Sequence, residues 1–418
     1  MRLRLIAPSI LAALFASAAG AAPKGHPARL TGRFEPLATF SVSGGVAEIV
    51  AATPKGRLLV YTDAVSQEIG FVDIHDPENP EQIGVLAMGG EPTSVAITPN
   101  GRWALVAVAG PNDLAVVCLA TLEILTRIPL FGQPDCVAIS PNGRFAAIAI
   151  ENERDEDVDD GEMPQDPPGF LTIVDILGPA ASWQTRDVSL AGIATRFPTD
   201  PEPEFVAIGP GNIAAVTLQE NNHVILVRLK TGEIVGDFEA GATTHAADLQ
   251  DDGVISFTDT LVNARREPDG IAWTPKGRLV TANEGDYDVD LGDGEFVGGR
   301  DFTIFQTNGT VLFEPGSALE EAAAAEGLYP DSRSDSKGSE FEGVAVGVFR
   351  GLPYLFVGSE RGDFVAVYRL EHEDAPELIQ LLPTGDSPEG LLAIPNRGLF
   401  VTSNEGDGTL SIFGFQPD

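Results

Sequence analysis

The feature that most constrains the fold of this 418-residue chain is an internal repeat. Each copy has an apolar run, a turn of the form Pro-x-Gly or a looser equivalent, and a second apolar run, and two more apolar runs usually follow. Copies begin at Glu48, Thr93, Asp135, Glu204, Asp269, Glu342 and Glu389. Four short strands repeating about every 40–45 residues are typical of a propeller blade. The sequence therefore predicts an all-β fold, a seven-bladed β-propeller.

The two ends of the repeat array predict how the ring closes. The seventh copy stops after its third strand, at Phe415, and residues 37–45 resemble the missing fourth strand although they precede the first copy. An N-terminal strand that completes the last blade removes the exposed sheet edges. We therefore expect one domain over residues 30–415 rather than an open solenoid, which would need capping repeats.

Residues 1–22 have the features of a secretory signal peptide. Two arginines are followed by an apolar run and by a segment rich in small residues, a pattern that is too short to span a bilayer. We expect cleavage near residue 22, a periplasmic or secreted protein without a membrane span or a C-terminal sorting signal, and a monomer. Cys118 and Cys136 lie in apolar runs and are expected to be buried free thiols, although export would permit a disulfide.

The charge of the chain excludes two classes of partner. There are 62 Asp and Glu residues against 26 Lys and Arg, which gives a formal net charge of −36. Nucleic acids and anionic membranes need a basic surface, so neither is expected as a partner. Three tryptophans are too few for a quinoprotein with a tryptophan repeat in each blade.

Acidic residues recur at one face of the predicted ring. The first strands begin at this face, and six of their seven starting residues are acidic; every long insertion, over residues 151–169, 192–203, 242–268, 285–300 and 314–339, extends the same face. Clusters of oxygen ligands without cysteine favour Ca²⁺. The alternative is that these acids only cap the strands and accept backbone hydrogen bonds. The candidate metal ligands are Asp135, Asp269, Glu342 and Glu389 at the strand starts, and Asp286, Asp288 and Asp290 in an insertion.

The insertion that contains Asp286 has the alternating acids of a calcium loop. It is not an EF-hand, because Leu291 stands where that loop needs glycine and Val297 where it needs glutamate. A solvated acidic loop is the alternative interpretation.

Several longer motifs resemble the choice-of-anchor I family, also described as mesenchyme-specific cell-surface glycoprotein-like. The most specific are TANEGDYD from Thr281, DSRSDSKGSEFEGVAVG from Asp331, and VTSNEGDGTLSIF from Val401. The resemblance implies a secreted or surface propeller without a firmly assigned activity, whose relatives are sometimes labelled alkaline-phosphatase-like or phytase-like. Besides the metal candidates, it implies ligand-binding roles for Asn283, Glu284, Arg333, Asp335, Lys337, Glu360, Arg361, Asn404 and Glu405.

Two functions remain open from the sequence. The first is a non-catalytic binding or scaffold protein of the cell envelope, with a Ca²⁺-containing acidic face that takes a small-molecule, protein or glycan ligand. The second is a Ca²⁺-dependent phosphoesterase or lactonase-like hydrolase, in which Arg333 and Lys337 would hold an anionic substrate. Arg333, Lys337 and Arg361 could instead form ion pairs that fix the loops. His223 and His245, the candidate bases, are expected to be surface residues.

Overall fold

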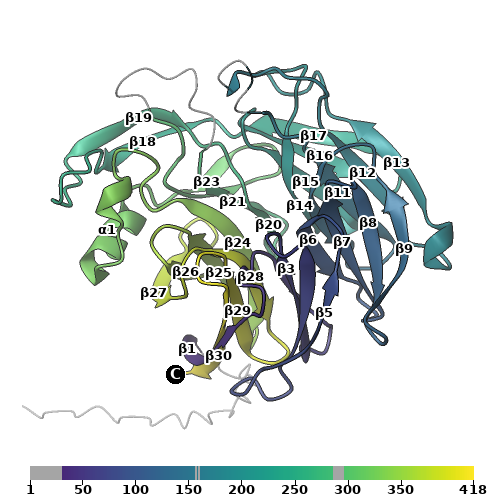
Figure 1. Ribbon diagram of the computed structural model, residues 1–418. Coiled ribbons are helices and arrows are strands. Elements are labelled where there is room, and N and C mark those ends of the chain that lie inside the picture. Colours follow the sequence, from purple (N-terminus) through teal and green to yellow (C-terminus); the bar gives the residue numbers. More distant parts are fainter. Residues whose placement is uncertain (1–30, 156–157, 159–160, 286–295) are drawn as a thin grey trace, which may run out of the picture.

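The protein is a seven-bladed β-propeller. The computed structural model describes residues 31–155, 158, 161–285 and 296–418. Seven four-stranded antiparallel sheets are arranged around a central channel (Figure 1). The seven innermost strands contact one another in a closed cycle, in the order β2, β6, β10, β14, β20, β24, β28 and back to β2. The predicted fold class is therefore confirmed.

Blades 1 to 4 follow the chain, with the innermost strand first. Blade 1 contains β2 (Val50–Ala52), β3 (Leu58–Asp63), β4 (Glu68–Asp73) and β5 (Glu81–Ala87). Blade 2 contains β6 (Glu91–Ile97), β7 (Trp103–Ala109), β8 (Asp113–Cys118) and β9 (Glu123–Pro129). Blade 3 contains β10 (Pro134–Ile139), β11 (Phe145–Ile150), β12 (Phe170–Asp175) and β13 (Gln184–Ser189). Blade 4 contains β14 (Pro203–Gly209), β15 (Ile213–Leu218), β16 (His223–Arg228) and β17 (Glu233–Glu239).

Blades 5 to 7 include the closure of the ring. Blade 5 contains β20 (Ile271–Trp273), β21 (Leu279–Asn283), β22 (Asp301–Phe305) and β23 (Val311–Phe313). Blade 6 contains β24 (Phe341–Phe349), β25 (Leu352–Ser359), β26 (Phe364–Arg369) and β27 (Glu377–Pro383). Blade 7 contains β28 (Pro388–Ile394), β29 (Leu399–Asn404) and β30 (Thr409–Pro417), and its outermost strand is β1 (Gly32–Ser41).

The N-terminal strand closes the ring as the repeat count predicts. It begins five residues earlier than expected, because β1 pairs with β30 from Gly32 opposite Pro417 to Ser41 opposite Thr409. The ring of Phe34 packs edge-on against Phe349, Phe356 and Phe415, with ring centroids 4.9–5.3 Å apart. This cluster joins the first strand to blades 6 and 7.

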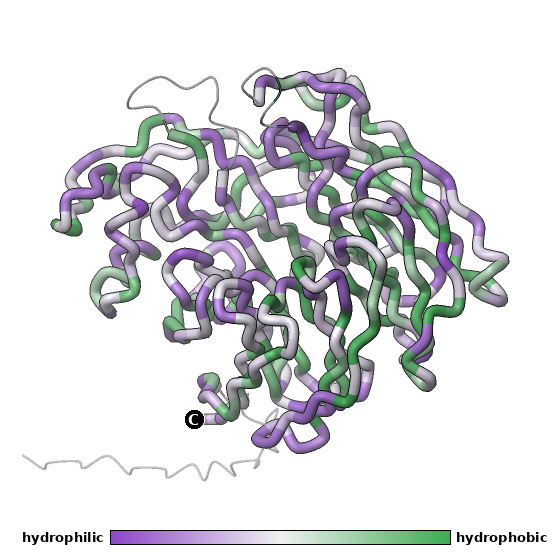
Figure 2. Tube along the Cα trace, viewed as in Figure 1, coloured by the Kyte–Doolittle hydropathy of each residue, from purple (hydrophilic) through white to green (hydrophobic). Residues whose placement is uncertain are grey.

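The hydrophobic core consists of the layers between neighbouring blades. The second strand β7 is almost fully buried along its length, whereas half-buried and exposed residues alternate in the outermost strand β5. Inner strands are covered on both faces by adjacent blades, and outer strands meet solvent on one side. Figure 2 shows the same arrangement, with hydrophobic strands inside and hydrophilic loops at the rim.

Two insertions form elements that the sequence analysis did not predict. A hairpin of β18 (Ala242–Ala247) and β19 (Asp259–Arg265) lies between blades 4 and 5, and helix α1 (Ala318–Glu326) lies between blades 5 and 6. The helix buries Leu319 and Ala323 in the layer between blades 5 and 6 and ends at Gly327, whose φ of 75° closes its last turn. No helix among the described residues is long and apolar enough to cross a membrane.

Candidate functional site

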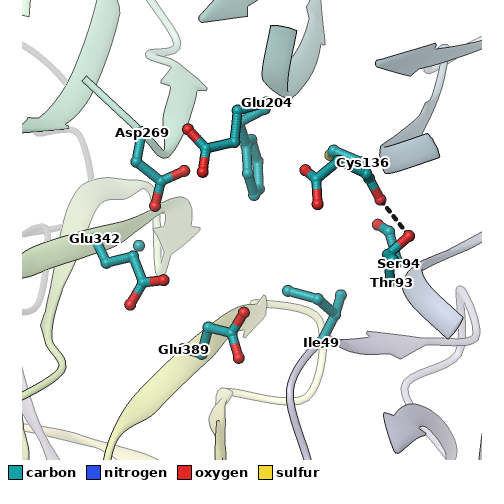
Figure 3. A pocket seen from close by; sticks show the side chains of 11 residues that line it. Ile49, Thr93, Ser94, Cys136, Glu204, Asp269, Glu342 and Glu389 are labelled. Atoms are coloured by element: carbon teal, nitrogen blue, oxygen red, sulfur yellow. Dashed lines mark hydrogen bonds between the residues drawn. The ribbon is translucent and has the colours of Figure 1, made fainter. Parts of the chain in front are cut away.

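The upper face of the ring, at which the first strands begin, contains a small acidic cavity at the mouth of the channel. Its volume is about 70 Å³. Five carboxylates from consecutive blades, here called the mouth acids, line it: Asp135, Glu204, Asp269, Glu342 and Glu389. In Figure 3 the labelled carboxylates of Glu204, Asp269, Glu342 and Glu389 surround the same space. The fold therefore brings four of the predicted metal ligands together.

The repeat register explains why these side chains converge. Each mouth acid lies within two residues of the start of an innermost strand, and these strands surround the channel. Blade 2 has Thr93 at this position, whose hydroxyl donates to the carbonyl oxygen of Asp135 at 2.7 Å. In blade 1 Ile49 lines the cavity, one residue after Glu48. Ser94, Cys136 and Phe205 also line it; the sequence analysis missed these residues, although each directly follows a repeat start.

Three carboxylates approach closely enough to share an ion. One oxygen each from Asp269, Glu284 and Glu342 lies within 4.8 Å of the others. Glu284 follows β21, the second strand of blade 5, and it also accepts hydrogen bonds from Gln219 Nε2 and Lys337 Nζ, both at 3.1 Å. Asp269 and Glu342 are thus predicted metal ligands, and Glu284 joins them from the set predicted to bind a ligand.

The environment of the mouth acids disfavours their charged form. Burial, together with neighbouring carboxylates, raises the pKa of Glu204, Asp269, Glu342 and Glu389 well above the ordinary value. The same causes raise the pKa of Asp135 to about 7. One oxygen each of Glu204, Glu342 and Glu389 is buried without a hydrogen-bond partner among the described residues. The mouth acids therefore tend to keep their protons, and a bound cation would stabilise their charged form.

Ion pairs fix the loop over residues 331–340 beside the mouth. Glu340 is 2% exposed and accepts from Arg333 Nε at 3.0 Å, Arg333 Nη2 at 2.8 Å and Arg361 Nε at 3.1 Å. Arg361 also pairs with Glu360 at 3.0 Å. Burial raises the pKa of Glu360 to about 7, and the charge of Arg361 opposes the shift. Arg333 and Arg361 thus pair with acids, whereas Asp335 on the same loop is exposed.

Arg300 also fixes the loop over residues 331–340. It is fully buried, and its guanidinium donates to the carbonyl oxygens of Asp248, Ser334 and Ser336. The buried Glu320 of α1 accepts from the backbone N–H of Ser339 at 2.9 Å. Neither Arg300 nor Glu320 was singled out from the sequence, because their burial depends on how three insertions pack together.

Several other predicted residues have structural contacts. Asn283 and Asn404 end equivalent second strands and are fully buried. Asn283 Nδ2 donates to Asp301 and Thr303, and Asn404 Nδ2 donates to Thr409 and Ser411, so both amide N–H groups already have partners inside their own blades. Glu405 is exposed at the rim. Asp286, Asp288 and Asp290 lie outside the described residues.

The expectation of surface histidines was wrong for His223. This residue is 3% exposed, and its Nε2 lies 3.1 Å from Asp237 Oδ2. His245 is half-buried in β18, with its ring nitrogens 2.8 and 2.9 Å from the carbonyl oxygens of Ala246 and Gly299. Neither histidine lines the mouth cavity.

The two cysteines are free thiols. Cys136 is buried, and burial raises the pKa of its thiol above the ordinary value. Cys118 is half-exposed, contrary to the expected burial, and its hydrogen bond with the Thr121 side chain lowers its pKa.

Comparison with solved structures shows the fold alone, because the sequences differ widely. A total of 1526 chains match. One is Kuenenia stuttgartiensis hydrazine synthase, with TM-score 0.62 and 15% identity, covering 90% of this chain and 98% of that chain. Another is the β-propeller domain of Myceliophteria thermophila Cps50 (Swd1), with TM-score 0.58 and 11% identity, covering 91% and 99%. A catalytically inactive virginiamycin B lyase from Staphylococcus aureus with quinupristin has TM-score 0.60 and 12% identity, covering 91% and 99%.

A search of curated protein sequences finds no match. The family model of the choice-of-anchor I domain, in contrast, matches residues 48–297 and 288–373. These ranges include six of the seven repeat starts and the motifs that contain Glu284, Arg333 and Glu342. The chain therefore belongs to the choice-of-anchor I domain family.

Proposed function

We propose that this protein is an exported, monomeric, non-catalytic binding propeller whose channel mouth binds Ca²⁺. The propeller fold and the family fit a non-catalytic binding protein. The observation that carries the proposal is the convergence of Asp269, Glu284 and Glu342, whose oxygens lie within 4.8 Å of one another. The acidic upper face around the bound ion would receive a small-molecule, protein or glycan ligand.

Electrostatics favours a cation at this position. Two ionised carboxylates 4.8 Å apart repel by about 3–4 kcal/mol at an effective dielectric constant of 20. The described partners of the triad include a single ammonium group, that of Lys337, which bonds to Glu284. The unpartnered oxygens of Glu204, Glu342 and Glu389 add acceptors around the cavity.

The donor set selects the type of ion. All the candidate ligands are oxygens, which suits hard cations rather than zinc or copper. Ca²⁺ takes six to eight oxygens in flexible geometry, whereas Mg²⁺ demands a near-ideal octahedron. A ring of carboxylates from separate blades suits the flexible coordination of Ca²⁺ better.

The size of the cavity favours binding over catalysis. Pockets for small-molecule ligands have volumes of about 300–1,000 Å³, whereas the mouth cavity has about 70 Å³. This space fits an ion with a few waters, but not a phosphate ester or a lactone beside the ion.

Calorimetric titration of the full chain with CaCl₂ and MgCl₂, after treatment with a chelator, tests the metal site. We expect tighter binding of Ca²⁺ and a higher melting temperature in its presence. Glu342→Gln should weaken Ca²⁺ binding at least about tenfold, which corresponds to about 1.4 kcal/mol. Glu123→Gln, an exposed position at the start of β9, removes the same charge and should have no effect. Absence of Ca²⁺ binding by the unmodified protein would refute the metal site.

Turnover measurements test the non-catalytic role. Generic phosphate esters and lactones are incubated with the protein in the presence and absence of Ca²⁺. We expect no turnover above the uncatalysed rate. Ca²⁺-dependent hydrolysis that is lost in Glu342→Gln and kept in Glu123→Gln would instead establish the hydrolase.

A further inference from the structure

Basic residues gather on the lower face of the propeller, opposite the acidic mouth. Each blade turns there from its first to its second strand, and these seven tight turns contain no Asp or Glu. Six of them contain Lys or Arg in a chain with 62 acids and 26 bases. The exposed members are Lys55, Arg57, Arg102, Arg144, Lys276 and Arg350. We call this set the basic ring.

Contacts between turns show that the ring is continuous over several blades. Asn396 Nδ2 of blade 7 donates to the carbonyl oxygen of Pro54 in blade 1 at 2.9 Å. A Cβ atom on Gly101 of blade 2 would lie 3.2 Å from Pro54 Cδ, and one on Gly143 of blade 3 would lie 3.4 Å from Pro99 Cδ in blade 2. The turns of blades 7, 1, 2 and 3 therefore form one surface around the lower end of the channel.

These cations are available to an external partner. Among the described residues, Lys55, Arg57, Arg144 and Arg350 have no ion pair within 4.0 Å, and Arg102 only stacks over its neighbour Trp103 at 4.9 Å. The turns that join the third and fourth strands of the blades, here called the outer turns, lie on the same face. A basic residue beside one of them does have an ion pair, since Arg228, just before the outer turn of blade 4, pairs with Glu233 at 2.9 Å. The outer turns also contain most of the acids of this face, such as Asp76 and Glu78 in blade 1.

Two hollows on this face combine an exposed arginine with an aromatic ring. Arg144 and Phe145 line a hollow of about 460 Å³ beside the exposed Leu177, and Asp175, which pairs with Arg186 at 2.5 Å, lines it too. Arg350, Arg397 and the half-buried Phe415 line another, of about 370 Å³. A guanidinium beside an aromatic ring suits an acidic sugar, since the cation binds the carboxylate and the apolar face of the sugar packs on the ring.

We propose that the basic ring binds a linear acidic polysaccharide through the carboxylates of its sugars. The acidic outer turns favour this occupant over an anionic membrane, because a plane that reached the ring would also meet the acids around it. A second copy of the chain could offer its mouth acids to the basic ring. This occupant is disfavoured, because the mouth acids line a cavity of only about 70 Å³, which is too small to admit the basic turns. This proposal is independent of the Ca²⁺ site on the other face.

Binding of the full chain to fluorescently labelled polygalacturonate, with neutral dextran as the negative control, tests the proposal. We expect saturable binding at 20 mM NaCl that weakens at least about tenfold at 150 mM NaCl, because it depends on screened charges. The triple substitution Arg57→Gln, Arg102→Gln, Arg144→Gln should weaken binding at least about tenfold. These side chains are exposed, so the melting temperature should stay unchanged.

A matched variant distinguishes an effect of the basic ring from an effect of the net charge of the protein. The triple substitution Arg228→Gln, Lys230→Gln, Arg369→Gln removes the same charge from the outer part of the same face, at the ends of β16 and β26 and in the turn after β16, and should leave binding intact. Equal loss in both variants would overturn the proposal, as would absence of binding at 20 mM NaCl. Tighter binding to anionic phospholipid vesicles would assign the ring to a membrane, and self-association abolished by the first triple variant would assign it to a second copy; either result overturns the polysaccharide.

Discussion

Two groups of buried carboxylates lie within the same face of the propeller and differ in their partners. The mouth acids come from the starts of the first strands, and three of them keep an oxygen without a described hydrogen-bond partner. Glu267 and Glu340 come from the ends of insertions, and each pairs with arginine: Glu267 with Arg265 at 2.6 Å, and Glu340 with Arg333 and Arg361. We call this second pair the clamp acids.

The difference shows that buried acids have two separate roles in this molecule. A clamp acid is buried but pairs with a partly exposed arginine, so its charge is compensated and the pair fixes one loop geometry. A mouth acid is buried among other acids, so its charge opposes folding unless a proton or an external cation neutralises it. The same substitution should therefore have opposite effects on stability in the two groups.

The largest effect is expected at a clamp acid. Glu340→Gln weakens the charge-assisted hydrogen bonds that the buried carboxylate accepts from Arg333 and Arg361, and it should destabilise the protein by about 2–3 kcal/mol. Urea unfolding followed by circular dichroism measures the change. Glu326→Gln, exposed at the end of α1, is the control and should change stability by less than about 0.5 kcal/mol. A neutral or stabilising Glu340→Gln would abolish the distinction between the two groups.

The next effect is the pH dependence of the metal-free protein. The raised pKa of a mouth acid means that the folded protein keeps its proton to higher pH than the unfolded chain. Stability from this source is complete below about pH 4, the ordinary value for a carboxyl group, and is lost as pH rises through the folded value of about 7 for Asp135; Glu48, next to the cavity-lining Ile49, adds a similar loss near its folded value of about 8. We expect a fall of about 2 kcal/mol between pH 5 and pH 8, measured by urea unfolding in EGTA. Saturating Ca²⁺ should remove most of it, and a rise in stability over this range would contradict the assignment.

The sequence predicted the mouth acids more closely than the clamp acids, for a geometric reason. A propeller converts one register position of a repeat into a ring around the channel, so Asp135, Asp269, Glu342 and Glu389 could be brought together without knowledge of any loop. Glu284 could be placed at the same face because it follows a second strand. The role of these residues as metal ligands stays a prediction.

The clamps could not be predicted, because they depend on tertiary paths that no repeat fixes. The pairing of Glu340 with Arg333 and Arg361 requires the loop over residues 331–340 to fold back on blade 6, and the burial of Arg300 requires three insertions to meet. Asn283 and Asn404 could have been recognised as structural, since each ends a Thr-x-Asn segment in which the threonine hydroxyl donates to the asparagine Oδ1. The same motif in two blades indicates a strand-end contact rather than a ligand site.

A smaller effect of opposite sign is expected at a mouth acid. Glu389→Gln removes one charge from the mouth without removing a partner of an arginine, so it should stabilise the metal-free protein at pH 8 by about 1 kcal/mol. The same variant should gain less than the unmodified protein from Ca²⁺. Urea unfolding with EGTA and with CaCl₂ gives both values. Destabilisation in EGTA comparable to that of Glu340→Gln would place Glu389 among the clamps.

The smallest expected effect is at Lys337, which connects the two groups. Its ammonium lies 3.1 Å from Glu284 Oε1, at the edge of the triad, on the loop that Glu340 holds. It also favours the charged form of Asp269 and so opposes the rise in the pKa of that residue. The ammonium group of Lys337 competes with a divalent cation for the same carboxylates. Lys337→Met should therefore tighten Ca²⁺ binding about three- to fivefold, which is less than 1 kcal/mol. Calorimetric titration measures this change, with Lys230→Met on an outer turn as the control. Weaker Ca²⁺ binding in Lys337→Met would mean that the lysine positions Glu284 for the ion and is itself part of a clamp.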